Sequence, residues 1–318
     1  MNILEIKNLN LSFTLQDRDF QALYDINLAL EKGKTLAIVG ESGCGKTMSA
    51  MSVIRLLPNN AKILSGEILY NNENLLELTE KEMQKIRGKQ IAYIPQDPMT
   101  SLNPLYSIGN QIEEILEIHR GLKGKEAKDA AIEVLEQVKI PNAKERLTNY
   151  PHEFSGGMRQ RVIIAMAIAT NAPIIIADEP TTALDVTVQA QIMDLLSELQ
   201  KEHETSIILI SHNLALVSQN SDDIAVMYAG HIVEQSKSQE LFDNPKHPYT
   251  KALLKSLPTL STEHLETIEG QPPSVREIFS HCPFEPRCKE KLPICNEKIP
   301  PQIIINGGNV NCWRFSNN

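Results

Sequence analysis

The stretch Thr35-Leu36-Ala37-Ile38-Val39-Gly40-Glu41-Ser42-Gly43-Cys44-Gly45-Lys46-Thr47 decides the fold of this chain. It begins as a short apolar run and continues as a glycine-rich turn that matches the pattern G-x-x-x-x-G-K-[ST]. The apolar run predicts a buried strand, and the residues after the turn predict a helix. Glycines let a backbone wrap around a phosphate without Cβ clashes, and the amides at a helix N-terminus point toward that anion. The stretch therefore predicts a phosphate-binding loop between a strand and a helix.

This phosphate loop, residues 40–47, supplies most of the candidate binding residues. Lys46 is expected to reach the β and γ phosphates of a nucleotide, and Thr47 to offer its hydroxyl to Mg²⁺. Cys44 is expected to contribute its amide rather than its thiol. The residues predicted to bind the nucleotide are Gly40, Glu41, Ser42, Gly43, Cys44, Gly45, Lys46 and Thr47.

Two carboxylates follow a second apolar run, Ile174-Ile175-Ile176-Ala177. Asp178 comes at the predicted end of this strand, where it can hold Mg²⁺ directly or through water. Glu179 is one residue further on and can polarise an attacking water molecule. Together with the phosphate loop, these carboxylates predict a magnesium-dependent nucleotide site.

Further short apolar runs indicate an α/β fold, because strands this short and this apolar suit a parallel sheet covered on both faces. The spacing of Val188, Ile192 and Leu199 predicts an amphipathic helix, for which Asp185 is a suitable N-cap. Residues from about 97 to 170 lack strand-like runs and show helical spacing, which predicts a helical insertion. The predicted strands are Thr35–Val39, Gln90–Ile94, Ile174–Ala177 and Ser206–Ile210.

Charge and hydropathy argue against several function classes. The formal net charge of −9 disfavours a nucleic-acid-binding protein, which would show a basic face, and disfavours membrane attachment through a polybasic surface. No run approaches the roughly 20 apolar residues that cross a bilayer. The first residues show no secretory signal. We therefore expect a protein of the cytosol, where thiols stay reduced.

The chain changes character after about Val233. The alternation of strands and helices ends there and prolines cluster, so we expect a loop-rich tail that cannot build a core from its own side chains. Disulfides are disfavoured in a reducing compartment, and structural zinc sites usually show closer cysteine pairs. The residues alone leave zinc, an iron–sulfur cluster and free thiols open. The four cysteines of the tail are Cys282, Cys288, Cys295 and Cys312.

Other segments follow the phosphate loop in a fixed order. Phe154-Ser155-Gly156-Gly157-Met158 lies shortly before the Asp178–Glu179 strand end. In this order and at this spacing the segments resemble the ATP-binding cassette (ABC) ATPases, and residues 154–158 resemble their signature segment, with Met158 in place of the more common glutamine. The other matches are Gln96 to the Q-loop glutamine, Ala183-Leu184-Asp185 to the D-loop, His212 to the switch histidine, and Phe13, with Phe20 second, to the aromatic residue that stacks on adenine.

The resemblance implies a P-loop NTPase core of the ABC type with a helical insertion subdomain. Two such domains would face each other head to tail, with the ATP on one phosphate loop covered by the signature segment of the other. Glu179 would orient water and His212 would contact the γ-phosphate, as the catalytic residues. The signature residues facing a partner's ATP would be Ser155, Gly156, Gly157 and Met158, and Mg²⁺ would involve Thr47, Gln96 and Asp178.

The tail narrows the resemblance to one branch of the family. Residues 242–254 resemble the segment that follows the cassette in oligopeptide and dipeptide importer ATPases, and the four cysteines resemble the C-terminal motif of that branch. The resemblance favours a [4Fe–4S] cluster at these cysteines, with Zn²⁺ as the alternative. It implies a nucleotide-binding domain over residues 1–234, with its helical subdomain at about 97–170. A small, loop-rich C-terminal extension covers residues 235–318.

The resemblance implies an ATPase subunit that couples ATP hydrolysis to the uptake of oligopeptides or dipeptides. Its partners would be a second ABC ATPase, in a heterodimer, two transmembrane permease subunits and an extracellular solute-binding protein, with no nucleic acid. The subunit would lie at the cytoplasmic face of the membrane. The same role in a nickel or other small-solute importer, and a soluble ABC ATPase outside transport, remain alternatives.

Overall fold

The computed structural model describes residues 1–16, 18–182, 184–256, 268–274, 276–277, 279–305 and 307–316. The chain divides into two compact units. Unit 1 consists of residues 1–31, 35–77 and 209–318, and unit 2 consists of residues 32–34 and 78–208. Strand β8 (Ser206–Ser211) carries the chain across the boundary between them.

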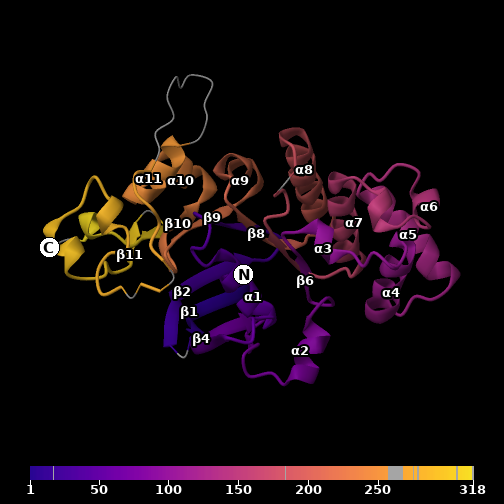
Figure 1. The fold of residues 1–318 in the computed structure, drawn as a ribbon, viewed down its shortest axis with the longest axis horizontal. Coiled ribbons are helices and arrows are strands. Elements are labelled where there is room, and N and C mark those ends of the chain that lie inside the picture. Colours follow the sequence, from indigo (N-terminus) through magenta and orange to yellow (C-terminus); the bar gives the residue numbers. More distant parts are fainter. Residues whose placement is uncertain are drawn as a thin grey trace. The chain divides into compact units, whose positions relative to one another are not determined.

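Unit 1 contains an antiparallel sheet with the strand order β2-β1-β4-β5, of which Figure 1 labels β2, β1 and β4. On β1 the buried residues Leu4 and Ile6 are followed by Leu9 and Leu11, so the alternation skips one residue. The pairing of β1 with β2 shifts register between Ile6 and Leu9, and this irregularity keeps the apolar side chains on the buried face. The strands are β1 (Asn2–Leu15), β2 (Arg18–Glu31), β4 (Ala61–Tyr70) and β5 (Glu73–Asn74).

A second group of strands in unit 1 runs in the order β11-β12-β10-β9-β3. The first of these in sequence, β3 (Thr35–Val39), is buried along its whole length and pairs in parallel with β9 (Asp223–Tyr228). The strand predicted before the phosphate loop is thus confirmed. The neighbouring β10 (His231–Lys237) pairs antiparallel with β9, and helices α1 (Lys46–Ile54) and α9 (Leu214–Asn220) complete this part of the unit.

The C-terminal extension is more regular than predicted. Two short strands, β11 (Ile303–Ile305) and β12 (Gly308–Val310), pair with each other, and β12 pairs with β10. The prediction that strands end near Val233 was wrong, because strands of three residues are too short to show an alternating pattern in the sequence. The helical elements here are α10 (Ser238–Asp243), α11 (Pro248–Lys255) and the 3₁₀ turns Glu285–Arg287, Pro293–Asn296 and Trp313–Phe315.

Part of the core of the extension is formed by packing against the cassette, as the composition of the extension predicts. The rings of Tyr249 and Phe284, both in the extension, lie 5.4 Å apart between centroids. Tyr228 at the end of β9 lies 4.7 Å from the first ring and 5.2 Å from the second. All three side chains are buried, so one aromatic cluster joins the extension to β9.

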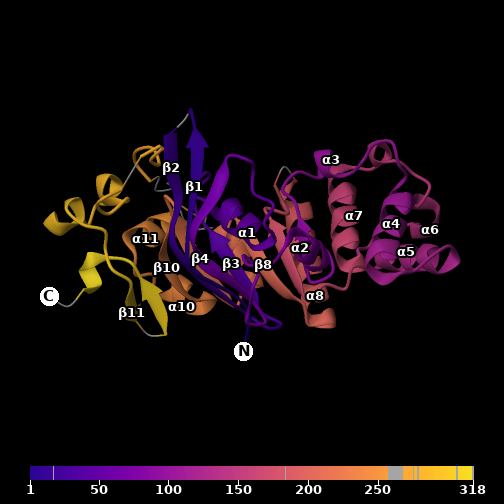
Figure 2. The same ribbon diagram turned by 90° about the horizontal axis from the view of Figure 1, so that it is seen from below.

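Unit 2 contains the parallel pair β6 (Ile91–Ile94) and β7 (Ile174–Asp178), both nearly fully buried as their apolar sequences predict. The region predicted to be helical does form helices, and Figures 1 and 2 both show α4, α5 and α6 gathered beside α7. Asp185 caps α8, with its carboxylate accepting a hydrogen bond from the Val188 amide at 3.0 Å. The helical elements are α2 (Glu80–Ile86), α3 (Pro98–Ser101), α4 (Ile108–Arg120), α5 (Lys125–Gln137), α6 (Ala143–Arg146), the 3₁₀ turn Pro151–Glu153, α7 (Gly156–Ala169) and α8 (Val186–His203).

Among the helices that these described ranges contain, none combines the length and the apolar character that a membrane crossing requires.

Buried polar groups fasten the start of α11 to β10. The carboxylate of Glu234 accepts hydrogen bonds from the amides of Lys246 at 2.7 Å and His247 at 2.8 Å. The ring of His247 then accepts a hydrogen bond from the Tyr249 amide at 3.0 Å and caps the helix. Burial lowers the pKa of His247 to about 3, so its ring stays neutral in the folded chain.

We expect the chain to lose stability through His247 as the pH falls from 7.5 to 5.5. An unfolded histidine titrates near 6.5, whereas the folded ring titrates at about 3, so below pH 6.5 the unfolded chain binds the extra proton. At pH 5.5 the loss amounts to about 1.4 kcal/mol. His247→Asn, whose side chain can still cap α11, should remove this part of the pH dependence in thermal unfolding. His152→Asn, at an exposed histidine, is the control. Equal acid sensitivity of His247→Asn and the unchanged chain would contradict the assignment.

Candidate functional site

The phosphate loop has the backbone that its glycines predict. Gly40, Gly43 and Gly45 have φ values of 155°, 79° and 108°. A Cβ atom on Gly40 would lie 2.1 Å from the carbonyl oxygen of Met227, whereas a Cβ atom on Gly43 would meet nothing within 4 Å. Gly40 is therefore required by a close backbone approach, and Gly43 only by its φ angle.

Lys46 is the first residue of α1 and is 5% exposed. Its ammonium group donates hydrogen bonds to the carbonyl oxygens of Gly40 at 2.9 Å and Glu41 at 3.0 Å. The lysine is thus directed back over the loop, and Thr47 follows it in the first turn of the helix. The thiol of Cys44 is buried and its pKa is raised by that burial.

Both candidates for stacking on adenine lie in unit 1 on the hairpin of β1 and β2. Phe13 and Phe20 are directly opposite each other across the two strands. Directly opposed residues of an antiparallel pair point to the same face. The two rings are half-buried, so the hairpin offers a pair of aromatic side chains rather than one.

The end of β7 presents a buried carboxylate. Asp178 is 1% exposed, and its Oδ2 atom accepts a hydrogen bond from the hydroxyl of Tyr93 on β6 at 3.0 Å. Burial, together with the charge of Asp178, raises the pKa of Tyr93, so this hydroxyl keeps its proton and remains a donor. Sequence reasoning missed the role of Tyr93, although a hydroxyl inside an otherwise apolar strand was a usable signal.

Glu179 lies directly after this strand with φ at 44°, the left-handed region that costs a residue with a side chain free energy. Its Oε2 atom accepts hydrogen bonds from the side-chain amide of Gln96 and the hydroxyl of Thr182, each at 2.9 Å. The structure thus brings together two of the sequence candidates, Gln96 and Glu179. It adds Thr182, which sequence reasoning did not identify.

The signature segment begins a helix. Ser155 caps α7 by accepting a hydrogen bond from the Met158 amide at 3.3 Å, while Ser155 and Gly156 remain exposed. A Cβ atom on Gly157 would lie 2.8 Å from Val188, the residue whose amide Asp185 caps. The starts of α7 and α8 therefore lie side by side in unit 2. Ala183, the first residue of the predicted D-loop, lies outside the described residues.

The candidate residues are divided between the two units. His212 follows β8 in unit 1 and its side chain is exposed. Unit 1 also contains the phosphate loop and the two phenylalanines. The candidates in unit 2 are Gln96, Ser155, Gly156, Gly157, Met158, Asp178, Glu179 and Asp185.

The four cysteines of the extension are free thiols that lie near one another. Burial, together with the charges of Cys295, Cys312 and Cys288, raises the pKa of Cys282 to about 12. The Cys282 amide also donates to the Cys295 carbonyl at 3.0 Å. Across the described part of the chain, however, no group of three or more His, Cys, Asp or Glu side chains is arranged to hold a metal ion. The fold gathers the thiols without forming a metal geometry.

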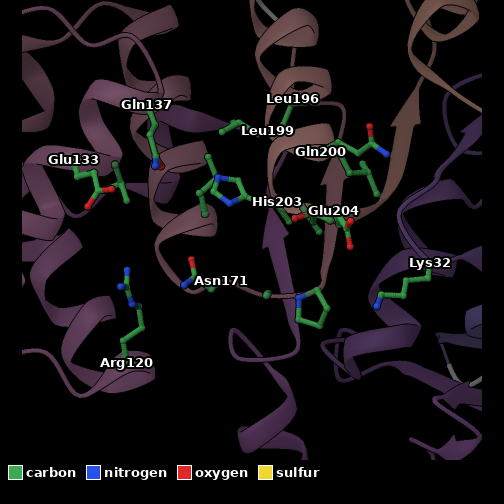
Figure 3. A pocket seen from close by; sticks show the side chains of 17 residues that line it. Lys32, Arg120, Glu133, Gln137, Asn171, Leu196, Leu199, Gln200, His203 and Glu204 are labelled. Atoms are coloured by element: carbon green, nitrogen blue, oxygen red, sulfur yellow. The ribbon is translucent and has the colours of Figure 1, made fainter.

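Unit 2 also contains a cavity of about 490 Å³. Figure 3 shows Arg120, Glu133 and Gln137 on one side of it and Gln200 and Glu204 on the other, with His203 between them. No residue predicted to bind nucleotide or metal lines this cavity. It is therefore separate from the candidate site.

Comparisons with known proteins agree with the motifs. Residues 23–182 match the family described as "ABC transporter", and residues 233–295 match the family described as "Oligopeptide/dipeptide transporter, C-terminal region". The chain is 46% identical to the dipeptide transport ATP-binding protein DppD of Bacillus subtilis over 98% of this chain and 94% of that protein. It is 45% identical to the oligopeptide transport ATP-binding protein OppD of Salmonella typhimurium over 98% of this chain and 93% of that protein.

Solved structures show the same fold. The dimeric ATP-binding cassette MJ0796, in a post-hydrolysis state bound to ADP and Pi, aligns with a TM-score of 0.66 and 29% sequence identity. The alignment covers 74% of this chain and 98% of that one. CbiO1 of Clostridium perfringens, part of the ABC transporter complex cbiONQ, aligns with the same TM-score and 28% identity, over 76% of this chain and 91% of that one.

We expect Gly40→Ala to destabilise the chain more than Gly43→Ala. Both changes place a side chain on an unfavourable φ angle, at a cost of about 1 kcal/mol, but only Gly40→Ala drives a Cβ atom into a backbone carbonyl. The additional overpacking should cost about 2 kcal/mol. Denaturant unfolding of the two variants measures the difference. Equal losses would show that the approach of Gly40 to Met227 imposes no constraint.

Proposed function

The chain belongs to the ABC transporter family of ATP-binding proteins, and from this premise we propose that it is the ATP-hydrolysing subunit of an oligopeptide or dipeptide importer. The observation that carries the proposal is about 45% identity to peptide-transport ATP-binding proteins over nearly the whole chain, including the extension. The extension matters here because the cassette alone would support ATP hydrolysis without indicating a class of cargo.

Each candidate residue has a proposed role in hydrolysis. Lys46 and the loop amides bind the β and γ phosphates, and Thr47 and Asp178 are proposed to hold Mg²⁺, for which a hydroxyl and a buried carboxylate are suitable donors. Glu179 orients the attacking water, and the hydrogen bonds that fix its carboxylate support this role. The other proposed contacts are Gln96 to the metal, His212 to the γ-phosphate and Phe13 to adenine.

The proposed assembly needs a second ATPase subunit. Ser155 and Gly156 are exposed at the start of α7, where a hydroxyl and helix amides can face a partner's ATP. The dimeric cassettes of MJ0796 support such pairing. We propose a heterodimer that docks beneath two transmembrane permease subunits at the cytoplasmic face of the membrane, supplied by an extracellular solute-binding protein. Residues near 96–104 are the proposed docking surface.

We propose that the chain divides into a nucleotide-binding domain and a C-terminal extension. Residues 1–234 form the nucleotide-binding domain, with a helical subdomain at about 97–170. Residues 235–318 form the extension. Helices α3 to α7 and the family match at residues 233–295 support these bounds.

We expect Lys46→Ala and Glu179→Gln to fail at different steps in the assembled complex. Lys46→Ala removes the phosphate contact, so ATP binding should fall at least about tenfold. Glu179→Gln keeps the hydrogen-bonding shape but loses the charge that polarises water, so ATP binding should persist while turnover falls about a hundredfold or more. Binding of radiolabelled ATP and uptake of a labelled dipeptide into proteoliposomes measure both steps. Turnover of Glu179→Gln within a factor of two of the unchanged complex would refute its role. Uptake of nickel without peptide uptake would refute the cargo.

For the extension we propose a structural [4Fe–4S] cluster held by the four cysteines, with Zn²⁺ as the alternative. The gathering of four thiols supports the proposal, although they are not arranged around a metal ion. Thiolate ligands suit both metals. The cluster would stabilise the extension and take no part in hydrolysis.

Anaerobically purified chain is expected to contain about four iron atoms and four sulfides per molecule, because a four-cysteine site of this kind binds one such cluster. Replacing the four cysteines of the extension by serine should remove both, and Cys44→Ser should remove neither. Metal analysis and acid-labile sulfide assays measure this. Finding one zinc atom and no sulfide would favour the Zn²⁺ alternative over the cluster. Absence of both iron and zinc would refute the proposal.

A further inference from the structure

We propose that Arg287 and Tyr249, both in the C-terminal extension, are positioning residues that hold the phosphate loop through Glu41 and so set its affinity for ATP. This inference rests on the proposed function, since it assigns a role within the same nucleotide site. It concerns unit 1 alone, which contains the loop and the extension.

The first contact is a bidentate salt bridge between Arg287 and Glu41. The two terminal nitrogens of Arg287 lie 2.7 Å and 3.0 Å from the two carboxylate oxygens of Glu41. The arginine side chain is 6% exposed and the glutamate side chain is 24% exposed. A two-point arginine–carboxylate contact restricts direction as well as distance, and here solvent screens it little. The side chain of Glu41 is thus held in one orientation.

Arg287 is itself fixed in place. Its Nε atom donates to the carbonyl oxygen of Glu269 at 3.0 Å, and a terminal nitrogen lies 3.3 Å from the hydroxyl oxygen of Tyr228. The guanidinium also lies over the Tyr228 ring, 5.8 Å from its centroid. Because every part of the guanidinium has a partner, the arginine can act as a fixed point rather than a mobile surface charge.

The second contact holds the backbone of the same loop residue. The Glu41 amide donates a hydrogen bond to the hydroxyl oxygen of Tyr249 at 3.0 Å. Tyr249 is fully buried in the aromatic cluster with Tyr228 and Phe284. The extension therefore holds Glu41 by its side chain and by its amide.

Glu41 passes this constraint to the residue that binds phosphate. Its carbonyl oxygen accepts a hydrogen bond from the Lys46 ammonium at 3.0 Å. A shift of Glu41 would therefore displace a partner of Lys46. The ion pair also neutralises a carboxylate in a loop that must accommodate a polyanion, and an unpaired Glu41 would repel the phosphates.

The test is equilibrium binding of Mg²⁺–ATP to the full chain, with ATPase turnover of the assembled complex measured in parallel. Arg287→Ala is expected to raise the Kd for ATP about tenfold, the size of one charge-assisted hydrogen bond. Turnover at saturating ATP should change less than about threefold, because no group that acts on the reacting atoms is lost. Arg287→Lys should give an intermediate Kd, since it keeps the charge but loses the two-point contact.

Three further variants sharpen the test. Tyr249→Phe should raise the Kd about threefold by leaving the Glu41 amide without its acceptor. The double variant Arg287→Ala with Glu41→Gln should bind ATP no more weakly than Arg287→Ala alone, because the two groups act as a unit. Lys289 lies two residues after Arg287 and forms an exposed ion pair with Glu269. Lys289→Ala removes this pair and should leave the Kd for ATP unchanged.

An unchanged Kd for Arg287→Ala, or weaker binding of ATP by the double variant than by Arg287→Ala, would overturn the inference. So would a rise in Kd that Lys289→Ala reproduces, because it would reflect general loosening of the extension. Failure of the unchanged chain to bind ATP would instead refute the proposed function.

Discussion

The close approach of Gly40 to the carbonyl oxygen of Met227 is the constraint on which the phosphate loop depends. Parallel pairing of β3 with β9 aligns Val39 with Val226, so the chain leaving β3 must turn directly against the end of β9. Only a residue without Cβ fits there. After this turn the loop leads into α1, of which Lys46 is the first residue.

A similar register controls the carboxylates of unit 2. Parallel pairing aligns Ile94 with Ala177, so the residues following β6 and β7 leave the strand ends together. This places Gln96 within hydrogen-bond distance of Glu179, and Tyr93 beside Asp178. The unfavourable φ of Glu179 persists because hydrogen bonds and packing around it hold the residue in place.

The extension shares an aromatic cluster and a sheet with the cassette. Its aromatic residues share one cluster with Tyr228 of β9, and β12 lengthens the sheet beside β10. The buried Glu234 secures the start of α11, which in turn places Tyr249. Contacts of this kind give a proline-rich segment an ordered position that its own side chains could not provide.

The sequence by itself determined the strand, loop and helix around residues 40–47, the carboxylates at the end of β7 and the capping of α8 by Asp185. Each depends on residues adjacent in the chain, whose spacing and stereochemistry are visible in the sequence. Only the tertiary structure decided that Tyr93 holds Asp178, that Phe13 faces Phe20, and that Arg287 pairs with Glu41 across 246 positions. Such pairs form because strand register and packing bring distant segments together, and no local pattern in the sequence records that register.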